Sequence, residues 1–442
     1  MLSRCLFILR LALPVTIAQL GFIAVSFADN IMVGRYSTES LAASSFVVNV
    51  FNVVLLGSIG FSYGLTPLIG ALFGRGENMS IGKTLRAGLI ANLIVALAAS
   101  SFMAIVYRFI PKMGQPAELL PLIRPFFLIY LASLIPAAIF NTFTQWSYAV
   151  RNTSMPMWIL LGCFSVNIVG NYALIYGHLG CPELGLFGAG LSTLFARVAG
   201  AVIIAGVFFM SRKYAVYREG LLNGRMPKGT LKKVFNTSWP VALQMSFETG
   251  AFSACAIFAG WLGTVSLASF QVILVIGTLG FCIYYSIGTA ISVLTANEMG
   301  RGLSEECRRP AFDGYIVMIA AMLVSCAIFI LFCRQLIGLF SDDERVISMA
   351  ASLLFPLVLY QLGDATQITF ANALRGTSRV RPLMWISFIS YIIVGLPSTW
   401  ILAFPASMGV YGIELSFSIS LFLAAALYLY AFLKATKIQS NA

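Results

Sequence analysis

Three acidic side chains lie inside stretches of the chain that are otherwise almost entirely apolar: Asp29, Glu248 and Asp364. An ionisable group in hydrocarbon costs about 2.5–3.5 kcal/mol on insertion scales, so such groups usually face a wet interior and serve a function. No Lys or Arg lies within one helical turn of Glu248 or Asp364. Two further acids, Asp313 and Glu414, fall in the opening turns of their predicted helices, where we expect water to reach them. We therefore expect only the first three to bind or carry a cation or a proton.

Polar side chains that could share a site with Asp29 follow later in the first half of the chain. Asn167 and Asn171 are spaced i,i+4, which places them on one face of a helix. Ser192 and Thr193 come from the next predicted helix. Carboxylate, amide and hydroxyl oxygens suit a hard cation such as Na⁺, whereas a buried carboxylate can equally carry a proton. Asn pairs also hold membrane helices together, so the ligand, proton and packing interpretations all stay open.

A second polar group is expected in the second half. Gln244 and Glu248 are spaced i,i+4 on one predicted helix. Gln361 and Asp364 are spaced i,i+3 on another, and Gln367 follows about one turn later. Each pair therefore shares a helix face, and the two faces together would form an acidic cluster.

The composition indicates the elements that must carry these residues. Of the 442 residues, 59% are hydrophobic and 10% are charged, against about 25% charged in a typical soluble domain. A soluble globular domain and a disordered chain are both excluded. Stretches such as 89–105 and 316–333 are apolar on nearly every side, which indicates helices in lipid and not the alternating strands of a membrane barrel. The first apolar stretch is too long for a signal peptide and no cleavage site follows it, so it is interpreted as a spanning helix.

Breaks in hydrophobicity, Pro and Gly residues and charge predict an all-α polytopic membrane protein with twelve transmembrane helices. Their approximate extents are 5–33, 44–73, 84–109, 121–150, 156–177, 186–211, 231–260, 266–299, 309–338, 346–374, 382–404 and 409–433. The termini and the even-numbered connections hold 21 of the 28 Lys and Arg residues, which predicts that both termini are cytoplasmic. This distribution explains the net charge of +12 without a nucleic-acid partner.

The two halves of the chain are related by an internal repeat. At a constant shift of 226, residues 34–76 align with 260–302 without a gap. Because six helices per half is an even number, the halves share one topology, as in transporters that alternate access between two bundles. We expect an N-terminal six-helix lobe over 1–211, a cytoplasmic linker over 212–230 whose basic residues touch anionic lipid, and a C-terminal six-helix lobe over 231–442. At the same shift Asp29 aligns with Cys255, so the scaffold repeats while the chemistry differs.

Enzyme signatures are absent from the sequence. No Walker A motif occurs, and neither H-E-x-x-H nor G-x-S-x-G appears with a plausible partner. The eight cysteines include no C-x-x-C, and the single histidine, His178, lies in a predicted loop, so neither a disulfide framework nor a zinc site is expected. We predict that the protein is not an enzyme, holds no cofactor, and takes the energy for any active transport from an ion gradient.

Ordered motifs across the whole chain resemble the multidrug and toxic compound extrusion (MATE) family. In the first half they are Ala12-Leu13-Pro14, Asp29-Asn30-Ile31-Met32-Val33-Gly34, Leu41-Ala42-Ala43 and Pro182-Glu183-Leu184-Gly185 with Gly188 and Gly190. In the second half they are Phe247-Glu248, Gln271, Ser286-Ile287-Gly288 and Leu374-Arg375-Gly376. Each motif is weak alone, whereas their order and spacing are specific.

The resemblance implies two six-helix bundles around a cavity and antiport of cationic or amphipathic compounds against Na⁺ or H⁺. It assigns amino-lobe coupling, with a possible Na⁺ site, to Asp29, Asn167, Asn171 and Thr193, although Ser192 could replace Thr193. It assigns carboxy-lobe coupling or substrate binding to Glu248 and Asp364, with Gln244, Gln271 and Gln361. Acids in both lobes favour the NorM-like branch of the family. The first-helix acid suggests a protein of the bacterial inner membrane, and we expect it to be monomeric.

Two other functions were weighed against efflux. A lipid-linked sugar flippase shares this helical plan, but its anionic cargo calls for a basic cavity, and Arg197 is the only basic residue well within a predicted span. A membrane receptor or scaffold would be favoured by sizeable soluble segments, which the sequence does not contain.

Overall fold

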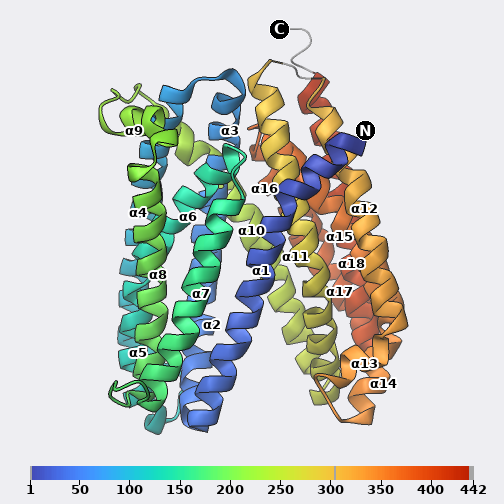
Figure 1. The fold of residues 1–442 in the computed structure, drawn as a ribbon. Coiled ribbons are helices and arrows are strands. Elements are labelled where there is room, and N and C mark those ends of the chain that lie inside the picture. The colour runs from blue at the N-terminus through green and yellow to red at the C-terminus, as the bar shows by residue number, and fades with distance from the viewer. Residues whose placement is uncertain (1, 303–304, 438–442) are drawn as a thin grey trace. The chain divides into compact units, whose positions relative to one another are not determined.

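The computed structural model describes residues 2–302 and 305–437, and every regular element in these residues is helical (Figure 1). Eleven of the described helices are long and apolar enough to cross a membrane. A twelfth span results if Glu344–Ser352 and Leu354–Gly376, which meet at a bend of 49°, are counted together. The prediction of an all-α polytopic membrane protein is confirmed.

The chain divides into two compact units, which we call the N-terminal unit (17–242) and the C-terminal unit (1–16 with 243–442). The N-terminal unit contains most of α1 (Leu2–Tyr36) and the start of α10 (Thr230–Trp261). Its other helices are α2 (Thr38–Tyr63), α3 (Leu65–Arg75), α4 (Asn78–Phe109), α5 (Leu120–Ala132), α6 (Leu134–Ala149), α7 (Ser154–Tyr176), α8 (Gly185–Met210) and α9 (Ala215–Leu222).

The C-terminal unit contains the first residues of α1 and the rest of α10. Its other helices are α11 (Thr264–Gly300), α12 (Arg308–Leu331), α13 (Cys333–Gly338), α14 (Glu344–Ser352), α15 (Leu354–Gly376), α16 (Arg381–Ser387), α17 (Leu396–Ala403) and α18 (Gly409–Lys437). A π-helical segment, Phe388–Gly395, joins α16 to α17, so that the three pieces form one span.

The internal repeat is visible in the way α1 and α10 are shared. α1 passes from one unit to the other between Thr16 and Ile17, and α10 does so between Ala242 and Leu243. These two points are separated by the same shift of 226 that relates the sequence halves. Both helices contain a proline two residues before the point of passage, and proline removes one backbone hydrogen bond there. The duplicated sequence therefore gives each half of the chain a first helix that is divided between the two units at the equivalent position.

Each unit has its own apolar core. In the N-terminal unit, Trp146 is fully buried and makes edge-to-face ring contacts with Phe208 and Tyr214. In the C-terminal unit, Phe417 stacks on Phe252 at 4.4 Å between ring centroids. Such aromatic packing fixes the helices whose other faces carry polar residues.

The expectation that helix ends expose Asp313 and Glu414 to water is wrong. Asp313 is 7% exposed, and its Oδ2 lies 2.6 Å from Nε of Arg4, at the start of α1. Glu414 is 1% exposed. The first turns of α18 are covered because Gly412 packs directly on the backbone of Leu402 at the end of α17. The position of Glu414 in the sequence did not indicate that α17 would pack over the start of α18.

Replacing Gly188 by Ala is expected to destabilise the N-terminal unit strongly. A Cβ at Gly188 in α8 would lie 2.4 Å from the backbone oxygen of Leu174 in α7, and backbone cannot move aside as a flexible side chain can. Overpacking of this kind costs about 1–3 kcal/mol. The midpoint of thermal unfolding in detergent, followed by size-exclusion chromatography of heated samples, should fall.

Gly206 provides the matched control, because it lies in the same helix and a Cβ there would meet nothing within 4 Å. Ala at this position should leave the midpoint unchanged or raise it, since Ala favours a helix by about 1 kcal/mol over Gly. Equal midpoints for the two variants would contradict the close α7–α8 contact.

Candidate functional site

The acid of the first helix is held by a residue of the predicted amide pair. Nδ2 of Asn171, on α7, donates to Oδ1 of Asp29, on α1, at 2.5 Å. Asn171 is almost fully buried, whereas Asp29 is partly buried. The structure therefore brings together two residues that are 142 positions apart in the chain.

The other predicted members of this group lie one helical turn away. Asn167 is buried, and its Nδ2 lies 3.4 Å from both Oγ of Ser192 and Oγ1 of Thr193 on α8. Ser192 Oγ in turn donates to the backbone oxygen of Asn167 at 2.7 Å. Both hydroxyls therefore line the same contact, and the geometry does not choose one of them over the other.

Two amide oxygens of this group are chemically suited to a cation. Oδ1 of Asn167 and Oδ1 of Asn171 are buried and make no hydrogen bond within the described residues. Buried polar atoms are normally hydrogen-bonded, so these two oxygens are available to a ligand. Like the carboxylate of Asp29, they are oxygen donors, the ligand type that a hard cation prefers.

An arginine that the sequence pattern did not assign lies near this group. Arg197, on α8, donates to Oγ of Ser133 at 2.7 Å and to the hydroxyl of Tyr130 at 3.2 Å. Its guanidinium lies 4.7 Å from the centroid of the Tyr130 ring, a cation–π distance. It also attracts Asp29 electrostatically. The only sequence signal for it was its position as a lone basic residue inside a span.

Gln244 and Glu248, the α10 part of the predicted polar group of the second half, lie beside another arginine in the C-terminal unit. Arg375, near the end of α15, is buried and donates to Oε1 of Gln244 at 3.3 Å and to Oδ1 of Asn372 at 3.1 Å. It attracts Glu248, one turn after Gln244 on α10. Arg375 lies just beyond the predicted span 346–374, and the sequence did not indicate this role, because its partner Gln244 is 131 positions away.

Asp364 and Gln361 lie in the interior of the C-terminal unit. Asp364 is 2% exposed, and its Oδ2 makes no hydrogen bond within the described residues. The carboxylate of Glu248 repels that of Asp364 electrostatically. Gln361 is fully buried with neither amide atom hydrogen-bonded in the described chain, and it packs on Gly280 of α11.

Gln271 is placed differently from the other predicted residues. It lies on α11 and its side chain is exposed. Among the described residues, no hydrogen bond joins it to Glu248 or Asp364. The structure therefore brings Gln244 and Glu248 to Arg375 and couples Glu248 to Asp364. Gln361 lies one turn before Asp364 on α15, and Gln271 has no described contact with these residues.

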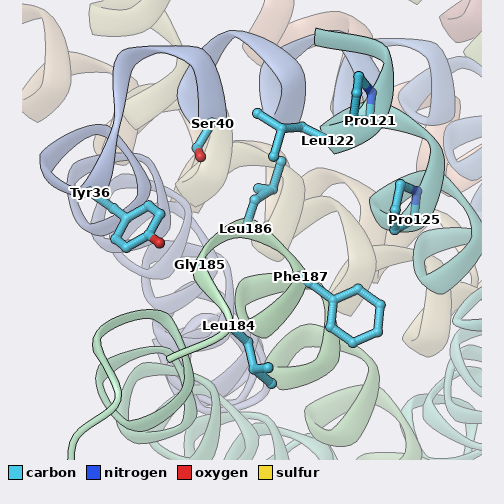
Figure 2. Close-up of a pocket in the computed structure, with 9 residues that line it drawn as sticks. All are labelled: Tyr36, Ser40, Pro121, Leu122, Pro125, Leu184, Gly185, Leu186 and Phe187. Atoms are coloured by element: carbon cyan, nitrogen blue, oxygen red, sulfur yellow. The ribbon is translucent and has the colours of Figure 1, made fainter. Parts of the chain in front are cut away.

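The N-terminal unit also contains a small pocket (Figure 2). Its volume is about 120 Å³, below the roughly 300–1,000 Å³ of typical small-molecule sites. None of the predicted site residues lines it. The lining residues are Tyr36, Ser40, Pro121, Leu122, Pro125, Leu184, Gly185, Leu186 and Phe187.

Comparison with known proteins agrees with this architecture. The family model described as MatE matches residues 14–173 and again 240–401, and the two matches begin 226 positions apart. The "Multidrug resistance protein MdtK" of Edwardsiella ictaluri is 30% identical over 95% of this chain and 93% of its own length. The "Multidrug resistance protein PmpM" of Pseudomonas aeruginosa is 30% identical over 88% of this chain and 82% of its own.

A third relative, the "Probable multidrug resistance protein NorM" of Bradyrhizobium diazoefficiens, is 27% identical over 96% of this chain and 92% of its own. Among solved structures, "MATE in complex with MaL6" superposes with a TM-score of 0.89 at 19% identity, covering 99% of this chain and 98% of that one. The "eukaryotic MATE transporter AtDTX14" gives 0.84 at 18% identity, covering 99% of both chains. These two structures support the fold alone.

Proposed function

Because this chain belongs to the MatE family, we propose that it is a secondary active efflux transporter that exchanges cationic or amphipathic compounds for Na⁺ or H⁺. The relatives named as multidrug resistance proteins support the export of several small molecules. The observation that carries the coupling is the contact between Asp29 and Asn171 beside two buried amide oxygens without hydrogen bonds. A carboxylate in that setting binds either a proton or a hard monovalent cation.

The proposed coupling uses the electrostatic balance around each acid. With no cation bound, Arg197 attracts the Asp29 carboxylate, and Arg375 attracts the carboxylate of Glu248. Protonation or Na⁺ binding at Asp29, with Asn167, Asn171 and Thr193 or Ser192 as further ligands of Na⁺, cancels the first attraction. A ligand shifts an equilibrium between two access states only through its different affinity for them, and this change of charge would supply that difference.

The C-terminal unit would contribute the second acidic group. Glu248 and Asp364 repel each other, so a lipophilic cation or a proton that arrives between them is stabilised. Gln244 and Gln361 would orient such a substrate by hydrogen bonds. We place the protein in a bacterial inner membrane as a monomer with both termini in the cytoplasm, and its only partners would be small molecules and lipids.

Dye transport with separate ion gradients tests the proposal. The full chain is reconstituted in proteoliposomes, and ethidium movement is followed by fluorescence while a Na⁺ gradient or a pH gradient is imposed alone. We expect one gradient or both to drive ethidium against its own gradient, and the matching ionophore to abolish the effect. Failure of both gradients to drive ethidium, or any other lipophilic cation tried, would overturn the proposal.

A further inference from the structure

Glu414 is a buried acid that the site described above does not use. It is 1% exposed, and its Oε1 makes no hydrogen bond within the described residues. Asp313, which also lies in the first turns of its helix, is paired with Arg4; none of the ion pairs of the described chain includes Glu414. A carboxylate buried without a partner is strongly disfavoured and normally neutralises. Glu414 is therefore a group that holds a proton.

The surroundings of Glu414 favour a proton over a metal cation. Cys255 of α10 and Tyr360 of α15 both interact with it electrostatically. Cys255 Sγ lies 3.6 Å from Oγ1 of Thr399 on α17, which in turn lies 2.5 Å from Oγ of Ser416. These thiol and hydroxyl groups donate and accept protons, whereas a thiol is a poor ligand for a hard cation such as Na⁺.

Tyr360 connects Glu414 to the acids of the C-terminal unit. It interacts electrostatically with Asp364, one turn later on α15, with Glu414, with Glu248 and with Tyr284 of α11. A phenol can donate and accept a hydrogen bond at the same oxygen. Tyr360 lies one turn before Asp364 on α15, and its ring lies beside Phe417, about one turn after Glu414 on α18. It is therefore placed between these acids and couples electrostatically to all three carboxyl groups.

The packing of α15 on α18 gives these groups an order along the bundle. The rings of Tyr360 and Phe417 lie 6.2 Å apart, and Gly363, next to Asp364, packs on Leu421. Asp364 on α15 therefore lies at the height of Leu421 on α18, which is about two turns after Glu414. Tyr360 lies between the heights of Glu414 and Asp364. Glu414 is the acid nearest to the start of α18.

We propose that Glu414 is a proton-binding residue at the end of a relay that runs through Tyr360 to Asp364 and Glu248. Glu414 releases its carboxyl proton toward the Tyr360 oxygen, directly or through bridging water, while Tyr360 passes its own proton to the Asp364 carboxylate. Glu414 becomes a carboxylate, Asp364 becomes a neutral acid, and Tyr360 is unchanged. This inference rests on the proposed function, since it supplies the coupling proton to the acids of the C-terminal unit.

The test uses the reconstituted full chain with ethidium as substrate and a pH gradient as the only driving force. We expect Glu414→Gln, which keeps the shape of the side chain, to reduce transport at least fivefold while the Kd for ethidium changes less than twofold. Glu414→Asp should restore part of the rate. Asp313→Asn, the matched control, should retain more than half of it, because Asp313 is paired with Arg4 and lies outside the relay.

A second variant and a binding readout decide the outcome if Glu414→Gln does not fold. Tyr360→Phe keeps the ring contact with Phe417 and removes the hydroxyl, so it should show the same loss. Proton release on ethidium binding, measured in detergent with the dye pyranine, should fall in both variants. Wild-type transport and proton release in Tyr360→Phe, or in a folded Glu414→Gln, would overturn the relay. Wild-type protein driven by Na⁺ alone would also overturn it and leave the proposed function standing, whereas an inactive wild type would refute the function itself.

Discussion

Asp29→Asn is expected to reduce ethidium export at least about tenfold, which corresponds to about 1.4 kcal/mol of lost stabilisation. Asn has the size of Asp and can still accept a hydrogen bond from Asn171, whose Nδ2 now bonds Oδ1 of Asp29. The substitution therefore removes the charge and leaves the contact between α1 and α7. Without that charge the site loses both its proton acceptor and its strongest cation ligand, so either ion gradient should fail to drive transport.

Initial rates in proteoliposomes, with the protein amount fixed by quantitative blotting, measure this effect. Glu77→Gln is the matched control, because Glu77 is an exposed acid whose pairing with Arg75 is at the surface and exposed pairs contribute about 0–1 kcal/mol. It should transport at the wild-type rate. An Asp29→Asn variant that exports as fast as this control would show that coupling does not pass through the first helix.

The sequence predicted the fold, and helix spacing predicted which polar side chains share a helix face, for identifiable reasons. Apolar length predicted the spans, including the bent pair of α14 and α15, because a membrane sets helix length whatever the helices pack against. The i,i+4 rule placed Asn167 and Asn171 on one face of α7, and α8 supplies hydroxyls to that face. Within one helix, spacing is sufficient to predict shared orientation.

Contacts between helices were beyond that reasoning. Arg375 was interpreted as part of a connection, yet it reaches Gln244 across 131 positions, and Arg197 had no visible partner. Glu414 was expected to be wet because it is near the start of its helix, but α17 covers that start through the contact of Leu402 with Gly412. Helix packing decides these cases, and one sequence read alone does not contain it.

The double variant Glu248→Gln/Asp364→Asn is expected to lose no more transport than the more impaired of the two single variants. Asp364 is buried, Glu248 is partly buried, and their carboxylates repel each other. We expect them to act on one shared proton or cationic substrate, so that either substitution already disrupts it. Residues in direct interaction show coupling energies of about 0.5–3 kcal/mol, where independent sites add. A double-mutant cycle on initial ethidium rates, at fixed gradient and ethidium concentration, measures this coupling.

The control cycle combines Glu248→Gln with Asp343→Asn. Asp343 belongs to the same unit but forms an exposed pair with Arg345 at the start of α14, so the two effects should add within about 0.5 kcal/mol. Additive losses for Glu248 and Asp364 as well would mean that each acid serves its own ligand. Arg375, which attracts Glu248 and donates to Gln244, would then stabilise the charge of Glu248 alone. The charge of Asp364 would have to be neutralised by a different proton or cation.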